Sequence, residues 1–308
     1  MIVLSHDDVV RFLSIDECID AVERAFVAQA HGPASLSLHV DGGAFHVKAA
    51  AIDRNFVAKV NGNFFDNPSR GLPRIRGTIV LADATNGEPL AVMDSAWITL
   101  LRTGAATAVA ARHLARKDAK TLMVCGCGNQ GRVTIDAIRR VRDIEQVFLY
   151  DTDRAAAERL DGQIVDHPRD ADIVVTCTPS RTAFLSDAKP GTFIAAVGAD
   201  SREKQEIAPE LLARSGVVVD DLEQCATFGD LRYAIDAGLM RREDVRATLG
   251  EVIRGKKIDD DVIIFDSTGT ALQDVAAATI VYEKVREQMA DSGWRMTDSQ
   301  PAIRHPPS

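Results

Sequence analysis

The chain has 308 residues, enough for two domains of ordinary size, with the 46% hydrophobic and 26% charged content of a globular protein. A net charge of −9 argues against nucleic acid as a partner, because phosphate binding requires a basic face. No run of about 18 apolar residues is present, and the opening stretch MIVLSHDDVVRF is unlike a signal peptide, so we expect no membrane association. We expect a cytoplasmic protein with its five cysteines reduced and no metal site.

The first third of the chain predicts a mixture of helix and antiparallel strands. Ser14 and Glu17 have the spacing of a capping box at the start of a helix expected over 15–29. The runs AFHVKAAA and FVAKVN resemble strands, and GTIVLAD and PLAVMDS lie on either side of a turn. Because this turn contains Asn86-Gly87, a strong hairpin signal, we expect antiparallel pairing here.

The rest of the chain alternates strands with helices. After an alanine-rich helix expected over 99–116, the strand-like runs are TLMVCG, QVFLYD, DIVVTCT, TFIAAVG, GVVVDD and VIIFDS. Continuous apolar strands between helices predict a parallel sheet with both faces covered. A last helix is expected from Ala271 to Met289, with Thr270 and Gln273 as its capping box, before a loosely held tail, DSGWRMTDSQPAIRHPPS.

The sequence LMVCGCGNQGRV contains three glycines with the spacing G-x-G-x-x-G, between a strand-like run and a helix expected over 132–141. In a dinucleotide-binding loop, Gly126 permits the sharp turn, Gly128 lets the backbone approach a pyrophosphate, and Gly131 lets the helix pack closely on the sheet. The N–H groups at the helix N-terminus would bind the phosphates. The alternative is a tight turn that binds no ligand.

The next strand-like run, VFLYD, ends at Asp151, 20 residues beyond Gly131. A carboxylate at this place accepts hydrogen bonds from the ribose hydroxyls of the adenosine and repels a 2′-phosphate. Asp153 adds a second negative charge, and Arg154 is the only cation nearby in the sequence. The loop therefore predicts NAD, rather than NADP, as the cofactor.

Several further pieces occur in a fixed order: GLP, G-x-PLA-x-MD and RTGAA after Lys59, then AAVGAD at 195–200 and FDS-x-G-x-ALQD at 265–274. Together with the glycine loop they resemble the ornithine cyclodeaminase/μ-crystallin family, and the resemblance covers nearly the whole chain. This family includes ornithine and lysine cyclodeaminases, archaeal-type alanine dehydrogenases, ketimine and iminosuccinate reductases, and μ-crystallin. The match therefore specifies the family and not one activity.

The resemblance implies an α/β fold with two domains and a homodimer. Residues 113–267 are expected to form a Rossmann-type, doubly wound parallel-sheet domain that binds NAD. Residues 1–112 and 268–308 are expected to form a mixed α+β domain for substrate binding and dimerisation. The residues expected to contact the cofactor are Gly126, Gly128, Asn129, Gln130, Gly131, Asp151, Thr178, Gly198 and Ser267.

The resemblance also implies three catalytic residues in the cleft between the domains. Lys59 and Arg102 would bind the substrate, chiefly its carboxylate, and Asp200 would handle protons and water. A two-cation clamp suits an α-carboxylate, which arginine binds bidentately. From the residues alone the alternatives are an ion pair at a domain boundary for Arg102, a solvent-facing strand position for Lys59, and a cap for Asp200.

The activity expected is oxidation or reduction of the C–N bond of a small α-amino or α-imino acid, as in an amino acid dehydrogenase or imine reductase. The alternatives are a cyclodeaminase that uses NAD catalytically and a μ-crystallin-like binding protein. Cyclodeaminases of this family carry one more arginine before the lysine strand. No arginine lies between Arg24 and Arg54 here, and His39 or Lys48 would have to replace it.

Overall fold

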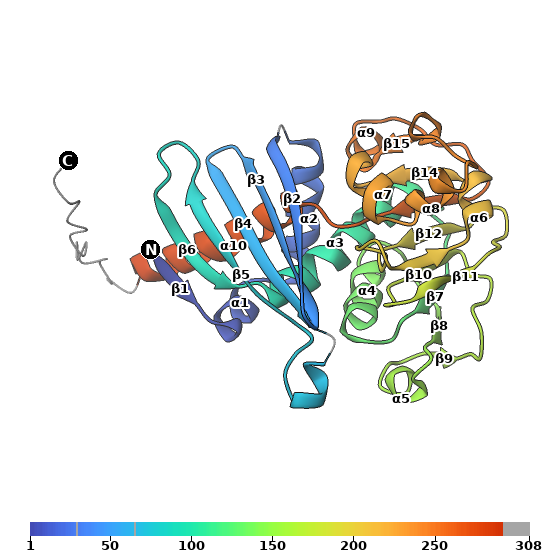
Figure 1. Cartoon of the computed structure of the whole chain (residues 1–308), viewed down its shortest axis with the longest axis horizontal. Helices are drawn as coiled ribbons and strands as arrows, with labels where there is room; N and C mark the ends of the chain where they lie inside the picture. The colour runs from blue at the N-terminus through green and yellow to red at the C-terminus, as the bar shows by residue number, and fades with distance from the viewer. Residues whose placement is uncertain (29, 65, 292–308) are drawn as a thin grey trace.

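The computed structural model describes residues 1–28, 30–64 and 66–291, so the tail expected at the C-terminal end lies, from 292 on, outside the described residues. Two parts lie side by side, and each is built around its own sheet (Figure 1). Helix α3 (Ala96–Leu114) packs against elements of both parts, and its buried alanines belong to a hydrophobic core that extends into each. The two parts of the molecule therefore pack together around α3.

The first part is a six-stranded sheet with the order β1-β6-β5-β4-β3-β2. Its neighbouring strands are antiparallel, except that β1 pairs in parallel with β6. The hairpin expected at Asn86-Gly87 joins β5 to β6, and Gly87 has the positive φ, 78°, that favours glycine. The strands are β1 (Ile2–Leu4), β2 (Ala30–Val40), β3 (Gly43–Ile52), β4 (Asn55–Phe64), β5 (Ile75–Asp83) and β6 (Pro89–Asp94).

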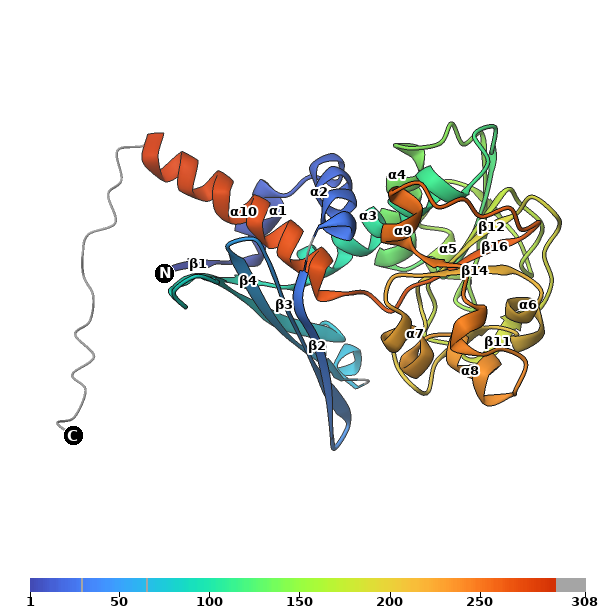
Figure 2. The same ribbon diagram turned by 90° about the horizontal axis from the view of Figure 1, so that it is seen from above.

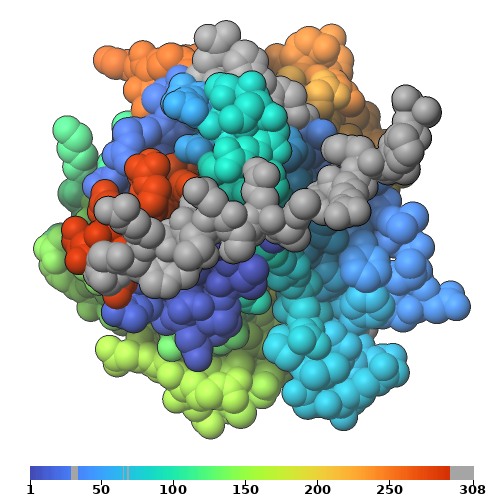
Figure 3. Space-filling view, turned by 90° about the vertical axis from the view of Figure 1, so that its left-hand side faces the viewer, coloured from blue at the N-terminus to red at the C-terminus, as the bar shows by residue number. Residues whose placement is uncertain are grey.

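Helices α1 (His6–Phe12), α2 (Ile15–Val27) and α10 (Ala271–Asp291) cover one face of this sheet, and no described helix covers the other (Figure 2). At the end of the molecule away from the second part, α10 lies against α1 (Figure 3). Because alternate residues of a strand share a face, the strand register places one set of apolar side chains on the uncovered face. These exposed side chains are Leu36, Leu38, Phe45, Val60 and Val80.

The second part is the expected parallel sheet, with the order β15-β14-β16-β12-β10-β7-β8-β9, and all of its strand pairs are parallel. Its strands are β7 (Thr121–Cys125), β8 (Gln146–Tyr150), β9 (Gln163–Ile164), β10 (Ile173–Thr176), β12 (Phe193–Ala196), β14 (Gly216–Val219), β15 (Ala247–Thr248) and β16 (Ile263–Asp266). A separate pair, β11 (Arg181–Leu185) and β13 (Gln205–Ile207), lies beside it.

Helices cover both faces of the parallel sheet, as the continuous apolar strands predict. Leu122 and Val124 of β7 belong to the core shared with α3 and α4, whereas Met123 and Cys125 belong to a second core on the opposite face. The remaining helices are α4 (Asn129–Arg139), α5 (Arg154–Ala157), α6 (Pro209–Ala213), α7 (Leu222–Phe228), α8 (Leu231–Asp236) and α9 (Leu249–Ile253), with short 3-10 turns at Pro68–Arg70 and Arg242–Asp244. The doubly wound α/β fold is therefore confirmed.

The two expected caps have different outcomes. Ser14 does cap α2, because its hydroxyl accepts a hydrogen bond from the Glu17 backbone N–H. The second capping box, at Thr270 and Gln273, is wrong. Among the described residues the Thr270 hydroxyl has no hydrogen-bond partner, and the Gln273 amide oxygen accepts a hydrogen bond from Arg102 instead. The charged Arg102 guanidinium is a stronger donor than a backbone N–H. It therefore binds the Gln273 side chain that a capping box would require.

Candidate active site

A cavity of about 240 Å³ lies between the two parts, where the carboxyl ends of β10, β12 and β16 face the first sheet and α3. Ligands of open α/β sheets bind at this edge. Six of the residues expected in the site line the cavity: Arg102, Gln130, Thr178, Gly198, Asp200 and Ser267. The first sheet and the segment before β5 contribute Asn63, Arg74 and Ile75. Lys59 is not among the lining residues and lies behind the cavity wall.

The glycine loop has the geometry that a dinucleotide requires. Gly126 has a φ of 102°, a backbone conformation that side chains disfavour. A Cβ on Gly131 would lie 2.1 Å from the carbonyl oxygen of Gly126, so only glycine fits where α4 meets the strand. Gly128, the N-cap of α4, faces open space and has no side chain to cap the helix. The first N–H groups of α4 are thus left for an anionic ligand.

The first turn of α4 contains Asn129, Gln130 and Gly131, because the helix begins three residues earlier than the sequence predicts. Asp151, at the end of β8, lies beside the loop. One of its carboxylate oxygens accepts a hydrogen bond from the Cys127 N–H at 2.7 Å, and the other accepts one from the Asp153 N–H at 2.9 Å. These bonds fix the carboxylate next to the glycine loop, where an adenosine ribose would lie. Burial raises the pKa of the Cys127 thiol to about 12, so this cysteine is not a nucleophile.

Lys59 and Arg102 meet at one buried carboxylate, that of Asp274. The Lys59 Nζ lies 2.7 Å from the Asp274 Oδ2, and the Arg102 Nε lies 3.3 Å from the Oδ1. Arg102 also donates from its NH1 to the Gln273 Oε1 at 2.6 Å. Both acceptors belong to the first turn of α10. Through these side-chain contacts the turn links Lys59 on β4 of the first sheet to Arg102 on α3. The sequence did not single out Asp274, which lies 215 residues from Lys59.

Lys48 adds a third cation to this cluster. It pairs directly with Lys59 across β3 and β4, and its Nζ donates to the carbonyl oxygens of Thr268 at 2.9 Å and Gly269 at 2.6 Å. Gly269 itself lies so close to Arg102 that a Cβ would be 2.2 Å from the guanidinium. Within the described residues Lys48 forms no ion pair, so three cations adjoin one paired carboxylate.

The pKa of the buried lysines reflects this excess of positive charge. The pKa of Lys59 is lowered to about 7: burial has the largest effect, Asp274 opposes it by raising the pKa, and Arg102 and Lys48 also lower it. Burial and Arg102 also lower the pKa of Lys48. A bound anion would stabilise the charged form of each lysine, because uncompensated buried charges are costly.

Asp200 lies on the opposite side of the cavity, after β12, with its side chain about half exposed. Its Oδ1 accepts a hydrogen bond from the Lys204 Nζ at 2.6 Å. Burial alone would raise the pKa of Asp200, but Lys204 holds it below its usual range. The carboxylate is therefore ionised at neutral pH, and it can accept a proton from a group in the cavity.

Two buried carboxylates that the sequence did not reveal hold the cavity loops. Glu206 accepts hydrogen bonds from the backbone N–H groups of Thr178, at 2.6 Å, and Gly198, at 2.9 Å, as well as from the hydroxyls of Thr176 and Thr178. Asp220 accepts from the Ser267 hydroxyl and the Gly269 N–H, both at 2.7 Å. These buried carboxylates, behind the cavity wall, therefore hold three lining residues in place: Thr178, Gly198 and Ser267.

The acidic cluster continues away from the cavity. The Asp230 Oδ1 accepts from the backbone N–H of Glu206, and Asp266 accepts from the N–H of Asp230. Burial raises the pKa of Asp230 to about 7 and raises that of Asp266 well above its usual range. Burial likewise raises the pKa of Glu206. The only signal in the sequence is that these acids follow or precede apolar strands, which does not distinguish them from surface residues.

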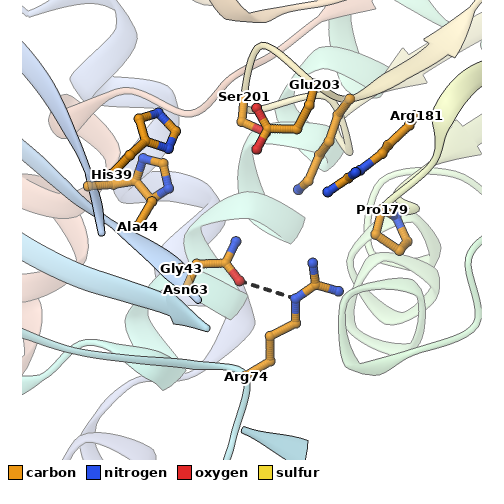
Figure 4. Close-up of a pocket in the computed structure, with 11 residues that line it drawn as sticks. His39, Gly43, Ala44, Asn63, Arg74, Pro179, Arg181, Ser201 and Glu203 are labelled. Carbon is orange, nitrogen blue, oxygen red and sulfur yellow. Dashed lines mark hydrogen bonds between the residues drawn. The ribbon is translucent and has the colours of Figure 1, made fainter. Parts of the chain in front are cut away.

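A smaller cavity adjoins the first one. His39 and His46 lie on its first-sheet side, with Arg74 and Asn63, and Arg181 lies on the other side (Figure 4). His46 is half-buried and lies 2.9 Å from the Ser37 hydroxyl through its Nδ1. Of the two residues that could replace the missing arginine, Lys48 thus lies among the buried cations and His39 at the smaller cavity. Both cavities belong to one cleft, because they share Asn63, Arg74, Pro179 and Lys204.

No group of three or more His, Cys, Asp or Glu in the described part of the chain has the arrangement of a metal site. Among the same residues no helix combines the length and the apolar character needed to cross a membrane. The five cysteines form no disulfide.

Comparison with known proteins gives a family match over residues 1–289, to the ornithine cyclodeaminase/mu-crystallin family. An alanine dehydrogenase of Archaeoglobus fulgidus is 38% identical over 303 residues, which cover 92% of this chain and 94% of the relative. A solved archaeal alanine dehydrogenase dimer with bound NAD superposes with a TM-score of 0.89 at 36% identity, over 94% of this chain and 97% of that chain.

A second solved structure is the Delta(1)-pyrroline-2-carboxylate reductase of Thermococcus litoralis, in complex with NADH and L-proline. It has a TM-score of 0.89 and 29% identity, and the match covers 94% of this chain and 98% of that chain. Both superpositions extend over 94% of this chain, and so over the greater part of both of its sheets.

Proposed function

Because the chain belongs to the ornithine cyclodeaminase/mu-crystallin family, we propose that it is an NAD-dependent oxidoreductase acting on the C–N bond of a small α-amino or α-imino acid. The observation that carries this proposal is the buried cluster of Lys48, Lys59 and Arg102 around one carboxylate, beside a cavity that also reaches the start of α4. Such a cluster suits an anionic substrate. The glycine loop, with its uncapped helix and Asp151, suits the cofactor.

In this proposal Arg102, which lines the cavity, binds the α-carboxylate, and Lys59 supports it through Asp274. NAD held at the glycine loop and Asp151 would supply the acceptor or donor for the hydride of Cα. The Asp200 carboxylate accepts the proton that leaves the nitrogen or the attacking water, and it returns one in the reverse direction. The imino acid then reacts with water to give an oxo acid and ammonia, or is reduced to the amino acid. Glu206 and Asp220 hold the loops that line this space.

A substrate panel tests this proposal: amino acids with NAD, and oxo acids with ammonia or methylamine and NADH. We expect net formation or consumption of NADH, followed by its absorbance, in step with ammonia. Ornithine or lysine with catalytic NAD is the decisive comparison. Ammonia with proline or pipecolate, and no net NADH, would show a cyclodeaminase. Tight NADH binding without turnover of any member of the panel would show a binding protein.

The choice of NAD over NADP is tested by titrating NADH and NADPH into the protein. We expect NADH to bind more tightly, because Asp151 would repel a 2′-phosphate. In the Asp151→Ser variant the preference should weaken. Tighter binding of NADPH by the unchanged protein would contradict the role of Asp151.

The first part of the chain, residues 1–112 with 268–308, is proposed to bind substrate and to form a homodimer, and residues 113–267 to bind NAD. The exposed apolar side chains on the helix-free sheet face support the dimer, because monomers rarely expose such a surface. Sedimentation should give twice the mass of the chain. Val60→Lys, on the inner strand β4 of this face, should give a monomer, whereas Leu239→Lys, on an exposed site of the second part, should not.

A further inference from the structure

His46 lies where the first sheet faces the second part of the molecule across the cleft. It lines the smaller cavity together with Lys204, which also lines the larger one. On β3 it is two residues from Lys48, so both side chains leave the same face of the sheet. Its partners in register are Ser37 on β2 and Asn61 on β4. The row of polar side chains that begins at the buried lysines therefore reaches the cleft at His46.

The hydroxyl of Ser37 orients the imidazole ring of His46. The distance between this hydroxyl and the His46 Nδ1 is 2.9 Å. A hydroxyl can accept a hydrogen bond from Nδ1–H in the neutral ring and in the charged ring alike. Nε2 is then the nitrogen that takes up and releases a proton.

Charged groups from both parts of the molecule act on His46. Burial has the largest effect on the pKa of His46 and lowers it. Asp200, across the cleft, raises this pKa, whereas Lys48, Lys204 and His39 lower it. The pKa lies below its usual value, so the ring is mostly neutral at neutral pH. The other charged side chains that line the smaller cavity are Arg74, Arg181 and Glu203 (Figure 4).

Asp200 alone is a poor store for the proton that the proposed reaction releases. Oxidation of an amino acid with NAD and water gives an oxo acid, ammonium, NADH and one proton. Against the effect of burial, Lys204, Lys48 and His46 hold the pKa of Asp200 below its usual range, so its acid form loses a proton readily at neutral pH. A group whose pKa is nearer to neutrality transfers protons more efficiently in both directions, and an imidazole is such a group.

We propose that His46 is a proton-transfer residue of the active site, which exchanges the proton of Asp200 with the solvent. This inference rests on the proposed function and adds a second proton-handling group to the same site. In the oxidative direction an N–H bond of the substrate breaks as the Asp200 carboxylate takes the proton. The new O–H bond breaks as the His46 Nε2 takes the proton, and the imidazolium releases it to water. In the reductive direction the imidazolium supplies the proton to Asp200.

The first test is His46→Gln, in which the amide keeps a hydrogen-bonding group for Ser37 but does not take up a proton at neutral pH. The assay uses the amino acid or oxo acid of the panel above that has the highest kcat/KM. We expect kcat to fall by about 10-fold, with the KM values and the melting temperature nearly unchanged. Added imidazole should restore much of the lost kcat and should not raise that of the unchanged protein. His167→Gln, at an exposed histidine of the second part, is the control and should behave like the unchanged protein.

The second test keeps His46 and removes the group that orients it. Ser37→Ala should lower kcat by about threefold, the effect of one hydrogen bond, and imidazole should restore this loss too. A kcat that either variant leaves unchanged, or a loss that imidazole does not restore, would overturn the role of His46 and leave the proposed function intact. Absence of NADH formation or consumption by the unchanged protein with every member of the panel would instead overturn the proposed function, and the role of His46 with it.

Discussion

Lys59 and Asp274 form a fully buried ion pair, with 2.7 Å between Nζ and Oδ2, that links the first sheet to the first turn of α10. Arg102 reaches the same carboxylate from α3. Among the residues that the structure describes, Asp274 is therefore the one anion paired with both cations proposed to act on the substrate. The chain leaves the parallel sheet at β16 and enters α10 only a few residues before Asp274, so this pair also fixes the connection between the two parts.

Asp274→Asn should destabilise the protein by about 3 kcal/mol or more, because removal of one partner leaves buried charges without compensation. Urea unfolding measures the change. Activity should fall as well, since Arg102 loses the carboxylate that holds its Nε. Glu287→Gln, an exposed position on the same helix, is the matched control and should unfold like the unchanged protein. Equal stability of the two variants would show that the pair contributes nothing to folding.

Arg102→Lys should lower kcat/KM by about 100-fold while NADH affinity stays nearly unchanged. Lysine keeps the charge but loses the planar fork that contacts Gln273, Asp274 and, in our proposal, the substrate carboxylate. Steady-state kinetics and NADH fluorescence titration separate the two effects. Near-native turnover would assign Arg102 to a structural ion pair between the parts.

Glu206→Gln should weaken NADH binding by about 10-fold, because an amide cannot accept hydrogen bonds at both ends. Either Thr178 or Gly198 then loses the acceptor for its backbone N–H, and the loop it belongs to shifts at the edge of the cavity. Titration of NADH, with kcat measured at saturating cofactor, gives the effect. Glu210→Gln, exposed on α6, should bind NADH normally. Unchanged NADH affinity in Glu206→Gln would mean that the loops keep their positions without this carboxylate.

The sequence predicts the elements whose signals are local. The glycine loop, the hairpin at Asn86-Gly87 and the alternation of apolar strands with helices each depend on neighbouring residues, and the structure contains them all. Strand β2 was not predicted. It is an edge strand whose sequence, AHGPASLSLHV, includes a glycine and a proline, and edge strands tolerate proline because one side of their backbone is unpaired.

The catalytic part of the candidate site was predicted only where the family resemblance supplied residues. Lys59, Arg102 and Asp200 were named in this way, and their roles stay proposals. Asp274, Glu206 and Asp220 were not named, because their significance comes from contacts across the fold. Asp220 binds a loop that lies 47 to 49 residues further on, and no spacing or composition indicates such a contact. A buried carboxylate can be recognised only once its hydrogen-bond donors are located.

Asp200→Asn should lower kcat by about 100-fold, the usual size of general acid–base help, with the melting temperature and NADH affinity unchanged. The amide keeps the size of the side chain and removes its ability to take up a proton. Lys204→Met tests whether Lys204 keeps Asp200 ionised. Without the ammonium group, the pKa of Asp200 should rise. The acidic limb of the profile of kcat against pH should then move to higher pH. Full activity of Asp200→Asn, combined with early melting, would identify Asp200 as a structural cap.

The stability of the protein should depend on pH through Lys59. In the unfolded chain its pKa is about 10.4, and in the folded protein burial lowers the pKa to about 7. Between these values the unfolded chain binds one more proton, so the free energy of unfolding rises with pH, by up to about 1.4 kcal/mol per pH unit. Below pH 7 both states hold the proton, and the dependence disappears.

Urea unfolding of the unchanged protein and of Lys59→Met, from pH 6 to pH 9.5, isolates this contribution. The unchanged protein should become more stable relative to Lys59→Met as the pH rises above 7. Lys257→Met, at an exposed position, should show a constant difference from the unchanged protein. A constant difference for Lys59→Met too would mean that Lys59 keeps its proton throughout the range, with Asp274 outweighing the effect of burial.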